Sequence, residues 1–157
     1  MFRTPRSVTR ALDRAEQPDR VTGRVAITRT WSLTLPGEFD RSMEHGLLRF
    51  SKRSLEVWVT AHANPDPSAA ALLDRLAESL PGDASFVKRS VRADGSSWLI
   101  YEARESAGSI VGISIGRRTL LSAHCVHGAE YVALDISARD RAGLGDGYAI
   151  VTSCGSG

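Results

Sequence analysis

Hydrophobic and polar residues alternate along residues 25–36, the first clearly patterned segment of the chain. Trp31, Leu33 and Leu35 are each separated by a single hydroxyl residue. A period of two turns one side of a segment toward a core and the other toward solvent, so the pattern predicts a half-buried strand. The strand is expected to end at Pro36-Gly37, a pair typical of turns.

A second alternating segment spans residues 55–62, after a short hydrophobic run at 47–50. Its small hydrophobic residues share one face, and Trp58 and His62 fall on the opposite face with Glu56 and Thr60. A tryptophan in that position marks either a second packed layer or an exposed recognition surface.

The period changes to that of a helix between residues 69 and 80. Asp66 and Pro67 are the expected N-cap and first helical residue, and Pro81-Gly82 is the expected end. An apolar stripe with charged residues opposite predicts that this helix packs on a sheet. The stripe consists of Ala69, Leu72, Leu73, Leu76, Ala77 and Leu80.

Strand patterns return after Asp83 and predict two hairpins. The first joins residues 85–92 to 98–105 through an Asp-Gly turn, and the second joins 110–115 to 119–126. The four strands are expected to form a meander.

The last two segments each allow two interpretations. Residues 129–142 fit a helix, which we favour, although Val132, Leu134 and Ile136 also alternate as in a strand. Glycines concentrate in residues 143–157, which are therefore predicted to be a flexible tail, with an edge strand at 148–151 as the alternative.

These elements predict an α+β fold in which two helices pack on a mostly antiparallel sheet of about six or seven strands. Three regions are expected: a flexible Arg-rich arm over residues 1–20, a single α+β domain over 21–142, and the Gly-rich tail over 143–157. A chain of 157 residues with 42% hydrophobic residues is long enough for one core.

The sequence Trp-Ser-Leu-Thr-Leu-Pro at 31–36, the tryptophan-bearing strand at 55–62 and the order of elements resemble the PsbP-like α/β/α sandwich class. The resemblance covers about residues 25–142. It implies a layer sandwich and small bacterial proteins that dock on larger complexes as adaptor or assembly factors, without a shared catalytic centre. It therefore assigns no site residue. The chain departs from the class in its short terminal helix and Gly-rich end.

Charge and composition narrow the classes of partner. The net charge of +2 resides in residues 1–20, because the other residues carry 15 basic and 15 acidic side chains. A body without net charge does not favour nucleic acid as a partner, and no apolar run is long enough for a membrane span. The 18 arginines against 2 lysines are typical of GC-rich bacterial coding. Two cysteines and no secretory segment at the start favour a cytoplasmic location.

His124 and Cys125 lie in a Leu-Leu-Ser-Ala-His-Cys-Val segment that is similar to the one carrying the catalytic histidine of trypsin-like proteases. A Ser-His-Asp triad also needs an activated serine, an orienting acid and an oxyanion hole. The chain has no Gly-Asp-Ser-Gly sequence, so we do not assign protease activity.

His62, His124 and Cys125 are the candidate residues of an alternative function, a metal-binding or hydrolytic enzyme. Neighbouring residues on a strand point to opposite faces, so His124 and Cys125 are not expected to bind the same ion. No CxxC or HxxxH spacing accompanies them. We therefore predict no cofactor and no catalytic residue.

Trp58, His62, Trp31 and Trp98 form the predicted interaction surface, because tryptophan supplies a large contact area and one hydrogen-bond donor. The sequence thus favours a small soluble, non-catalytic protein-binding or adaptor module. Its expected partner is another protein, with a homodimer as a further option.

Overall fold

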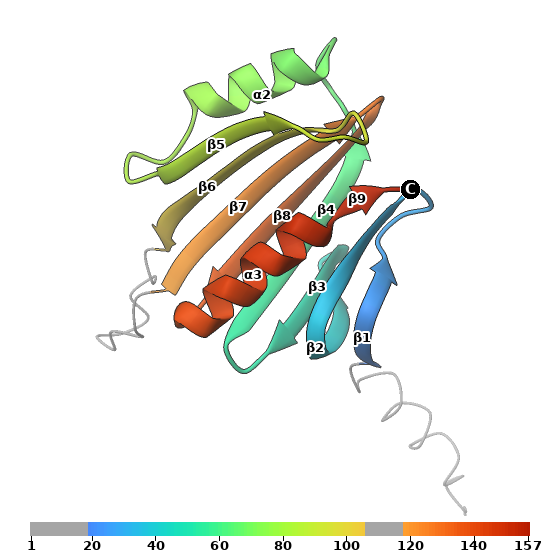
Figure 1. Cartoon of the computed structure of the whole chain (residues 1–157), viewed down its shortest axis with the longest axis vertical. Coiled ribbons are helices and arrows are strands. Elements are labelled where there is room, and N and C mark those ends of the chain that lie inside the picture. Colours follow the sequence, from blue (N-terminus) through green and yellow to red (C-terminus); the bar gives the residue numbers. More distant parts are fainter. Residues whose placement is uncertain (1–18, 106–117) are drawn as a thin grey trace, which may run out of the picture.

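The computed structural model describes residues 19–105 and 118–157 (Figure 1). Within these ranges, nine strands form one antiparallel sheet, which is not closed. Its order is β1-β2-β3-β4-β8-β7-β6-β5, with β9 paired to β2. The strands are β1 (Asp19–Ala26), β2 (Trp31–Glu44), β3 (Leu47–Lys52), β4 (Leu55–Ala63), β5 (Ser85–Val91), β6 (Ser97–Glu105), β7 (Arg118–His127), β8 (Glu130–Ala138) and β9 (Gly155–Ser156), and the helices are α2 (Ala69–Glu78) and α3 (Arg141–Ser153).

The predicted α+β class is wrong, because strands hold 58% of the described residues and the two short helices only 18%. The strand count of six or seven is also too low for the described part of the chain. One reason lies in residues 130–138, which form β8 rather than a helix. This strand pairs with β4 and β7 and is buried on both faces, so its sequence lacks the polar alternation that marks a half-buried strand.

The predicted flexible tail is wrong as well, since most of it forms α3. Asp140 caps this helix by accepting a hydrogen bond of 2.7 Å from the amide of Gly143. A Cβ atom on Gly143 would lie 2.6 Å from the carbonyl oxygen of Ser54, and one on Gly147 would lie 3.1 Å from Ile136. These two glycines therefore permit close packing of the helix on the sheet. The alternative edge strand at 148–151 falls inside the same helix.

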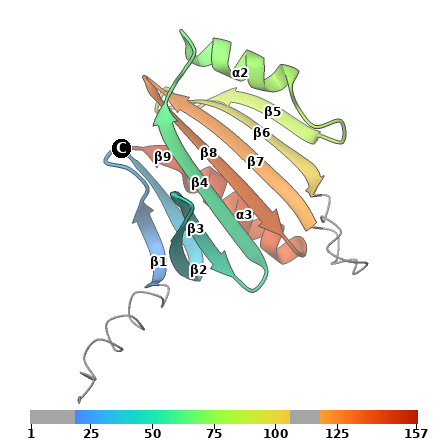
Figure 2. The same cartoon turned by 180° about the vertical axis from the view of Figure 1, so that it is seen from behind.

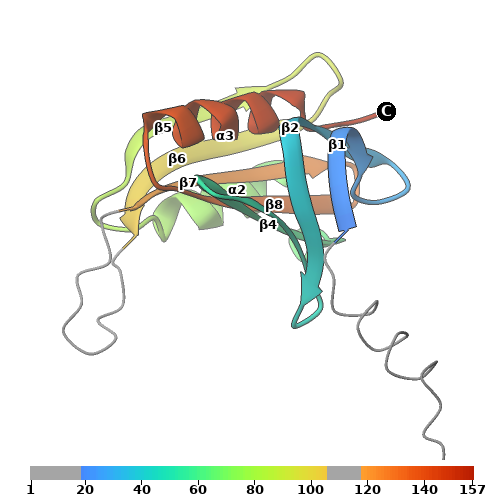
Figure 3. The same cartoon turned by 90° about the horizontal axis from the view of Figure 1, so that it is seen from below.

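The two helices of the described ranges cover opposite faces of the sheet (Figure 3). Helix α3 contacts β2, β4, β7 and β8, and we call this side the inner face. Helix α2 contacts β6 and β7 on the other side, the outer face. No helix of the described residues covers the part of that face over β4 (Figure 2). The large core lies between α3 and the inner face, and a smaller cluster lies under α2.

The predicted apolar stripe of α2 is confirmed, because its members pack on Leu99, Val126 and Tyr131. The helix begins slightly later than predicted. Ser68 is the N-cap and accepts a hydrogen bond from the amide of Ala71, while the predicted cap, Asp66, pairs with Arg75.

The first predicted hairpin is confirmed as β5 paired with β6. The predicted strand at 110–115 lies outside the described residues, as do residues 1–18 of the predicted arm. Residues 19 and 20 begin β1. In the described ranges, neither helix has the length and hydrophobicity to cross a membrane.

The sheet is curled, and two tryptophans make contact between β2 and β6 across its inner face. The rings of Trp31 on β2 and Trp98 on β6 are in edge-to-face contact, with centroids 6.4 Å apart. The guanidinium carbon of Arg92 lies 3.6 Å from the centroid of the Trp98 ring. Arg92 also donates hydrogen bonds to the carbonyls of Val151 and Cys154, at 3.0 and 2.8 Å. One side chain thus joins the β5–β6 hairpin to the end of α3.

The close packing of α3 predicts opposite effects of alanine at two of its glycines. Gly143→Ala should lower the free energy of unfolding by about 1–3 kcal/mol, because the new methyl group meets the Ser54 backbone. Gly145→Ala should raise it by up to about 1 kcal/mol, because that position is open and alanine favours a helix. Urea unfolding of both variants measures the difference. Equal effects would show that residues 143–153 do not pack as described.

Candidate functional site

The four residues of the predicted interaction surface do not lie together. Trp31 and Trp98 are only 1% and 0% exposed, in the core on the inner face, so their assignment to a surface is wrong. They are core residues because their side chains point to the face that α3 covers. Trp58 and His62 do share the outer face of β4, as the alternation predicted. Trp58 is half-buried and His62 is exposed.

Four aromatic rings, one from each of four neighbouring strands, form a row across the outer face. Tyr101 on β6 stacks with His124 on β7, and His124 stacks with Tyr131 on β8, each pair with centroids 6.0 Å apart. His62 on β4 meets Tyr131 edge to face at 4.8 Å. Sequence reasoning missed both tyrosines. The alternation in residues 131–137 could have placed Tyr131 here if that segment had been interpreted as a strand.

A chain of hydrogen bonds runs through the same row. Ser122 donates to Asp135 at 2.9 Å, so its oxygen is left to accept from Nε2 of His124, which lies 3.2 Å away. Nδ1 of His124 then accepts from the hydroxyl of Tyr131 at 2.6 Å. The network thus assigns a neutral histidine with its proton on Nε2.

The environment keeps both ring groups uncharged near neutral pH. Burial lowers the pKa of His124, and the charge of Asp135 offsets only part of that effect. Burial also raises the pKa of Tyr131 to about 12, together with the nearby charge of Asp135. The row is therefore a neutral polar network inside the sheet face.

This network differs from a catalytic triad in two respects. In a triad the acid binds Nδ1 of the histidine, and the histidine accepts the proton of the serine. Here Tyr131 occupies Nδ1, and the acid Asp135 binds Ser122 directly. Ser122 is also only 1% exposed, so a substrate in solvent cannot reach its oxygen. The geometry does not support a serine nucleophile.

The residues of the alternative enzyme function are separated by the sheet. Cys125 is 1% exposed in the inner core, whereas His62 and His124 lie on the outer face, so the three cannot bind one ion. Burial raises the pKa of the Cys125 thiol and raises that of Cys154 to about 12, which disfavours a reactive thiolate. Within the described ranges, no three His, Cys, Asp or Glu side chains are placed to hold a metal ion.

Trp58 is already engaged by a cation of its own chain. The guanidinium carbon of Arg49 lies 5.3 Å from the centroid of the Trp58 ring. Arg49 also pairs with Glu44 at 3.0 Å and with Glu56, which Arg118 approaches at 3.7 Å. The charged cluster therefore covers part of the tryptophan that sequence reasoning placed at the centre of the interaction surface.

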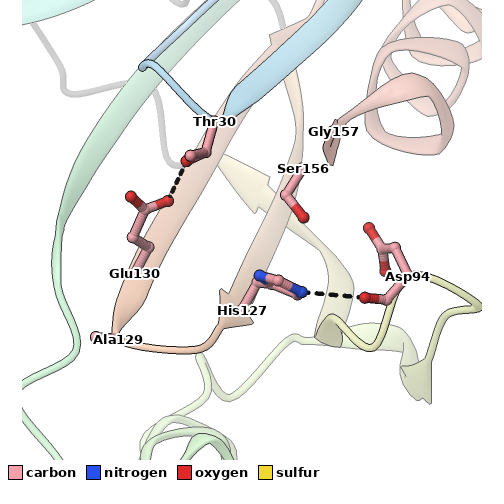
Figure 4. Close-up of a pocket in the computed structure, with 7 residues that line it drawn as sticks. All are labelled: Thr30, Asp94, His127, Ala129, Glu130, Ser156 and Gly157. Atoms are coloured by element: carbon pink, nitrogen blue, oxygen red, sulfur yellow. Dashed lines mark hydrogen bonds between the residues drawn. The ribbon is translucent and has the colours of Figure 1, made fainter.

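A pocket of about 660 Å³ lies between the β7–β8 turn, the start of β2 and residues Ser156 and Gly157 (Figure 4). Its polar side chains bond within the chain: Thr30 donates to Glu130 at 2.5 Å, and Nε2 of His127 lies 3.0 Å from the carbonyl oxygen of Asp94. Hydrogen bonds from Ser96 lower the pKa of Asp94. These hydrogen bonds connect neighbouring turns of the chain, so a structural role explains why polar side chains line the pocket. The lining residues are Thr30, Asp94, His127, Ala129, Glu130, Ser156 and Gly157.

Strand β5 exposes more large hydrophobic side chains than any other element of the described residues. It pairs with β6 on one side, and no described strand pairs with its other side. Of the five exposed large hydrophobic residues in the described ranges, three lie on this strand: Phe86 at 76%, Val87 at 50% and Val91 at 72% exposed. The sequence pattern missed this surface because alternation reports the faces of a strand and not its position in the sheet.

Comparison of the chain with protein-family models found no match, and comparison with curated proteins found none either. The resemblance to the PsbP-like class therefore stays a prediction.

The buried histidine predicts a pH dependence of stability. His124 has a lower pKa in the folded chain than its ordinary value near 6.5, so the unfolded chain binds the proton more tightly. Its contribution is fully present above about pH 6.5 and is lost as the pH falls, by at most about 1.4 kcal/mol per pH unit for one proton.

We therefore expect His124→Asn to reduce the slope of unfolding free energy between pH 7 and pH 5, measured by urea unfolding. The matched control is His45→Asn, in an exposed turn, which should leave the slope unchanged. An unchanged slope in His124→Asn would contradict the neutral network.

Proposed function

We propose that this chain is a non-catalytic protein-binding module that docks a segment of another protein on the open edge of β5. The observation that carries the proposal is the exposure of Phe86, Val87 and Val91 on a strand that pairs with a described strand on one side only. An edge strand offers a row of unpaired backbone donors and acceptors, which is a template for an added strand.

The opposite edge of the sheet differs from β5 and supports the choice. Strand β1 has no exposed large hydrophobic residue, and its single buried residue, Val25, packs into the core. Clusters of exposed hydrophobic residues are uncommon on surfaces that contact only water. The asymmetry between the two edges therefore favours β5 as the one that binds a partner.

The outer face at Trp58 and His62 is a second candidate docking surface. The exposure of His62 favours it, and so does the fact that neither helix of the described ranges covers the outer face over β4. Arg49 already contacts the Trp58 ring, however, so a partner would have to displace or share that cation. We therefore rank this face below β5. Either surface fits the adaptor role that the PsbP-like resemblance implies.

The docking surface can be identified by photo-crosslinking in the cells that naturally produce the protein. A photoreactive phenylalanine analogue is placed singly at position 91 on β5, at 62 on the outer face, or at 43 on β2. Met43 is 64% exposed and lies away from both candidate surfaces, so position 43 is the control. We expect a discrete adduct with another protein from position 91 and none from position 43.

Two outcomes would contradict the proposed site. An adduct from position 62 without one from 91 would place docking on the outer face. No adduct from position 91, or the same set of adducts from all three positions, would show that β5 is not a specific docking edge. Circular dichroism of each variant confirms that the fold is retained.

A further inference from the structure

A small pocket lies beside the open edge of β5. It has a volume of about 350 Å³, close to the lower size limit of pockets that hold small ligands. Ala70 and Leu73 of α2 form one side, and Arg89, Ser90 and Val91 of β5 form the other, with Ser97 of β6. The pocket is therefore bounded by a helix and an edge strand.

A strand added to β5 would place side chains next to this pocket. Arg89 and Val91 pair with Leu99 and Ser97 of β6, and Leu99 packs under α2, so these β5 residues lie on the outer face. Every second side chain of an added strand would lie on that same face. In strand addition, backbone hydrogen bonds supply affinity and such pockets supply specificity.

The regular part of β5 is short. The pairing with β6 shifts register between Ser85 and Lys88, and Phe86 within this bulge has a φ of 51°. Regular pairing then runs from Lys88 to Val91. A docked segment would pair with these four residues, and Phe86 and Val87 would flank it at one end.

The charge of β5 favours an acidic partner over a second copy of this chain. The strand contains Lys88 and Arg89 and no acidic residue. Arg89 pairs with Asp74 of α2, and Lys88 forms no ion pair with the other described residues. Two antiparallel copies of β5 would bring basic side chains close together, which is unfavourable. Carboxylates on an added strand would instead face Lys88.

We propose that the groove between β5 and α2 binds an extended acidic segment of another protein, which pairs with Lys88–Val91 and places an aliphatic side chain in the pocket beside Leu73. The inference rests on the proposed function and names the chemistry of its partner.

Synthetic peptides test this partner chemistry on the full chain. The probes are an acetylated nine-residue peptide of alternating glutamate and valine with a central leucine, the same peptide with lysine for glutamate, and the acidic peptide with central proline. Amide chemical shifts report where each one binds. We expect the acidic peptide to shift the amides of β5 and Ala70 and to bind about tenfold more tightly than the basic one. Proline lacks an amide donor and should abolish binding.

Two variants test the proposed contacts separately. Lys88→Glu should reverse the preference between the acidic and basic peptides. Ala70→Leu fills the pocket from an exposed helical position and should weaken binding of the acidic peptide about tenfold. Ala149→Leu makes the same change at an exposed position of α3 and should have no effect.

Three results would overturn the inference. The first is no shift at β5 with the acidic peptide at millimolar concentration, and the second is equal binding of the basic peptide. The third is that the unsubstituted chain forms a dimer in solution and that Val91→Lys converts it to a monomer. Where position 91 crosslinks to another protein and the peptides show no acidic preference, the inference fails and the proposed function holds. Where position 91 yields no adduct and no peptide shifts β5, both fail.

Discussion

One arginine and the two tryptophans beneath it connect strands β2 and β6 of the curled sheet. Arg92 stacks on Trp98, which contacts Trp31 from the far side of the sheet, and its donors bind the last carbonyls of α3. The C-terminal end of a helix carries partial negative charge, and the last turn of α3 contains no basic residue of its own. Arg92 supplies that charge from another element. Its hydrogen bonds therefore hold the helix, the curled sheet and the β5–β6 hairpin in one arrangement.

This arrangement separates the two faces by chemistry. The inner face is filled by α3 and carries the large apolar core, including both cysteines. The outer face carries the neutral network of His124 and Tyr131, whose polar atoms bond to one another. A satisfied network of this kind stabilises the sheet and offers no free nucleophile. Among the described residues, most of the exposed large hydrophobic side chains lie on β5. The contacts of Arg92 hold this strand in position.

The sequence predicted those features that depend on local periodicity. The faces of β2 and β4 and the apolar stripe of α2 agree with the structure, because a half-buried element shows its period directly. Residues 130–138 were interpreted as a helix, because a strand buried on both faces has too few polar residues to show a period of two. The glycines of α3 were interpreted as flexibility, although Gly143 and Gly147 serve close packing against residues distant in the chain. The position of β5 at an edge was not predictable, because strand order is set by pairing between distant segments. Trp31 and Trp98 were assigned to a surface because residues 143–157 were interpreted as a flexible tail, whereas α3 from this segment covers the face to which both side chains point.

Amide hydrogen exchange of Arg92→Met, compared with Arg24→Met, tests the role of Arg92 most directly. Arg24 lies on β1 and bonds only to a half-buried serine side chain among the described residues, so its loss controls for the removal of a surface charge. The account predicts that loss of Arg92 speeds exchange in both the last turn of α3 and the β5–β6 hairpin, while the central strands β4 and β8 stay protected. Unchanged exchange, or faster exchange in α3 alone, would contradict the conclusion that this side chain positions the β5 edge.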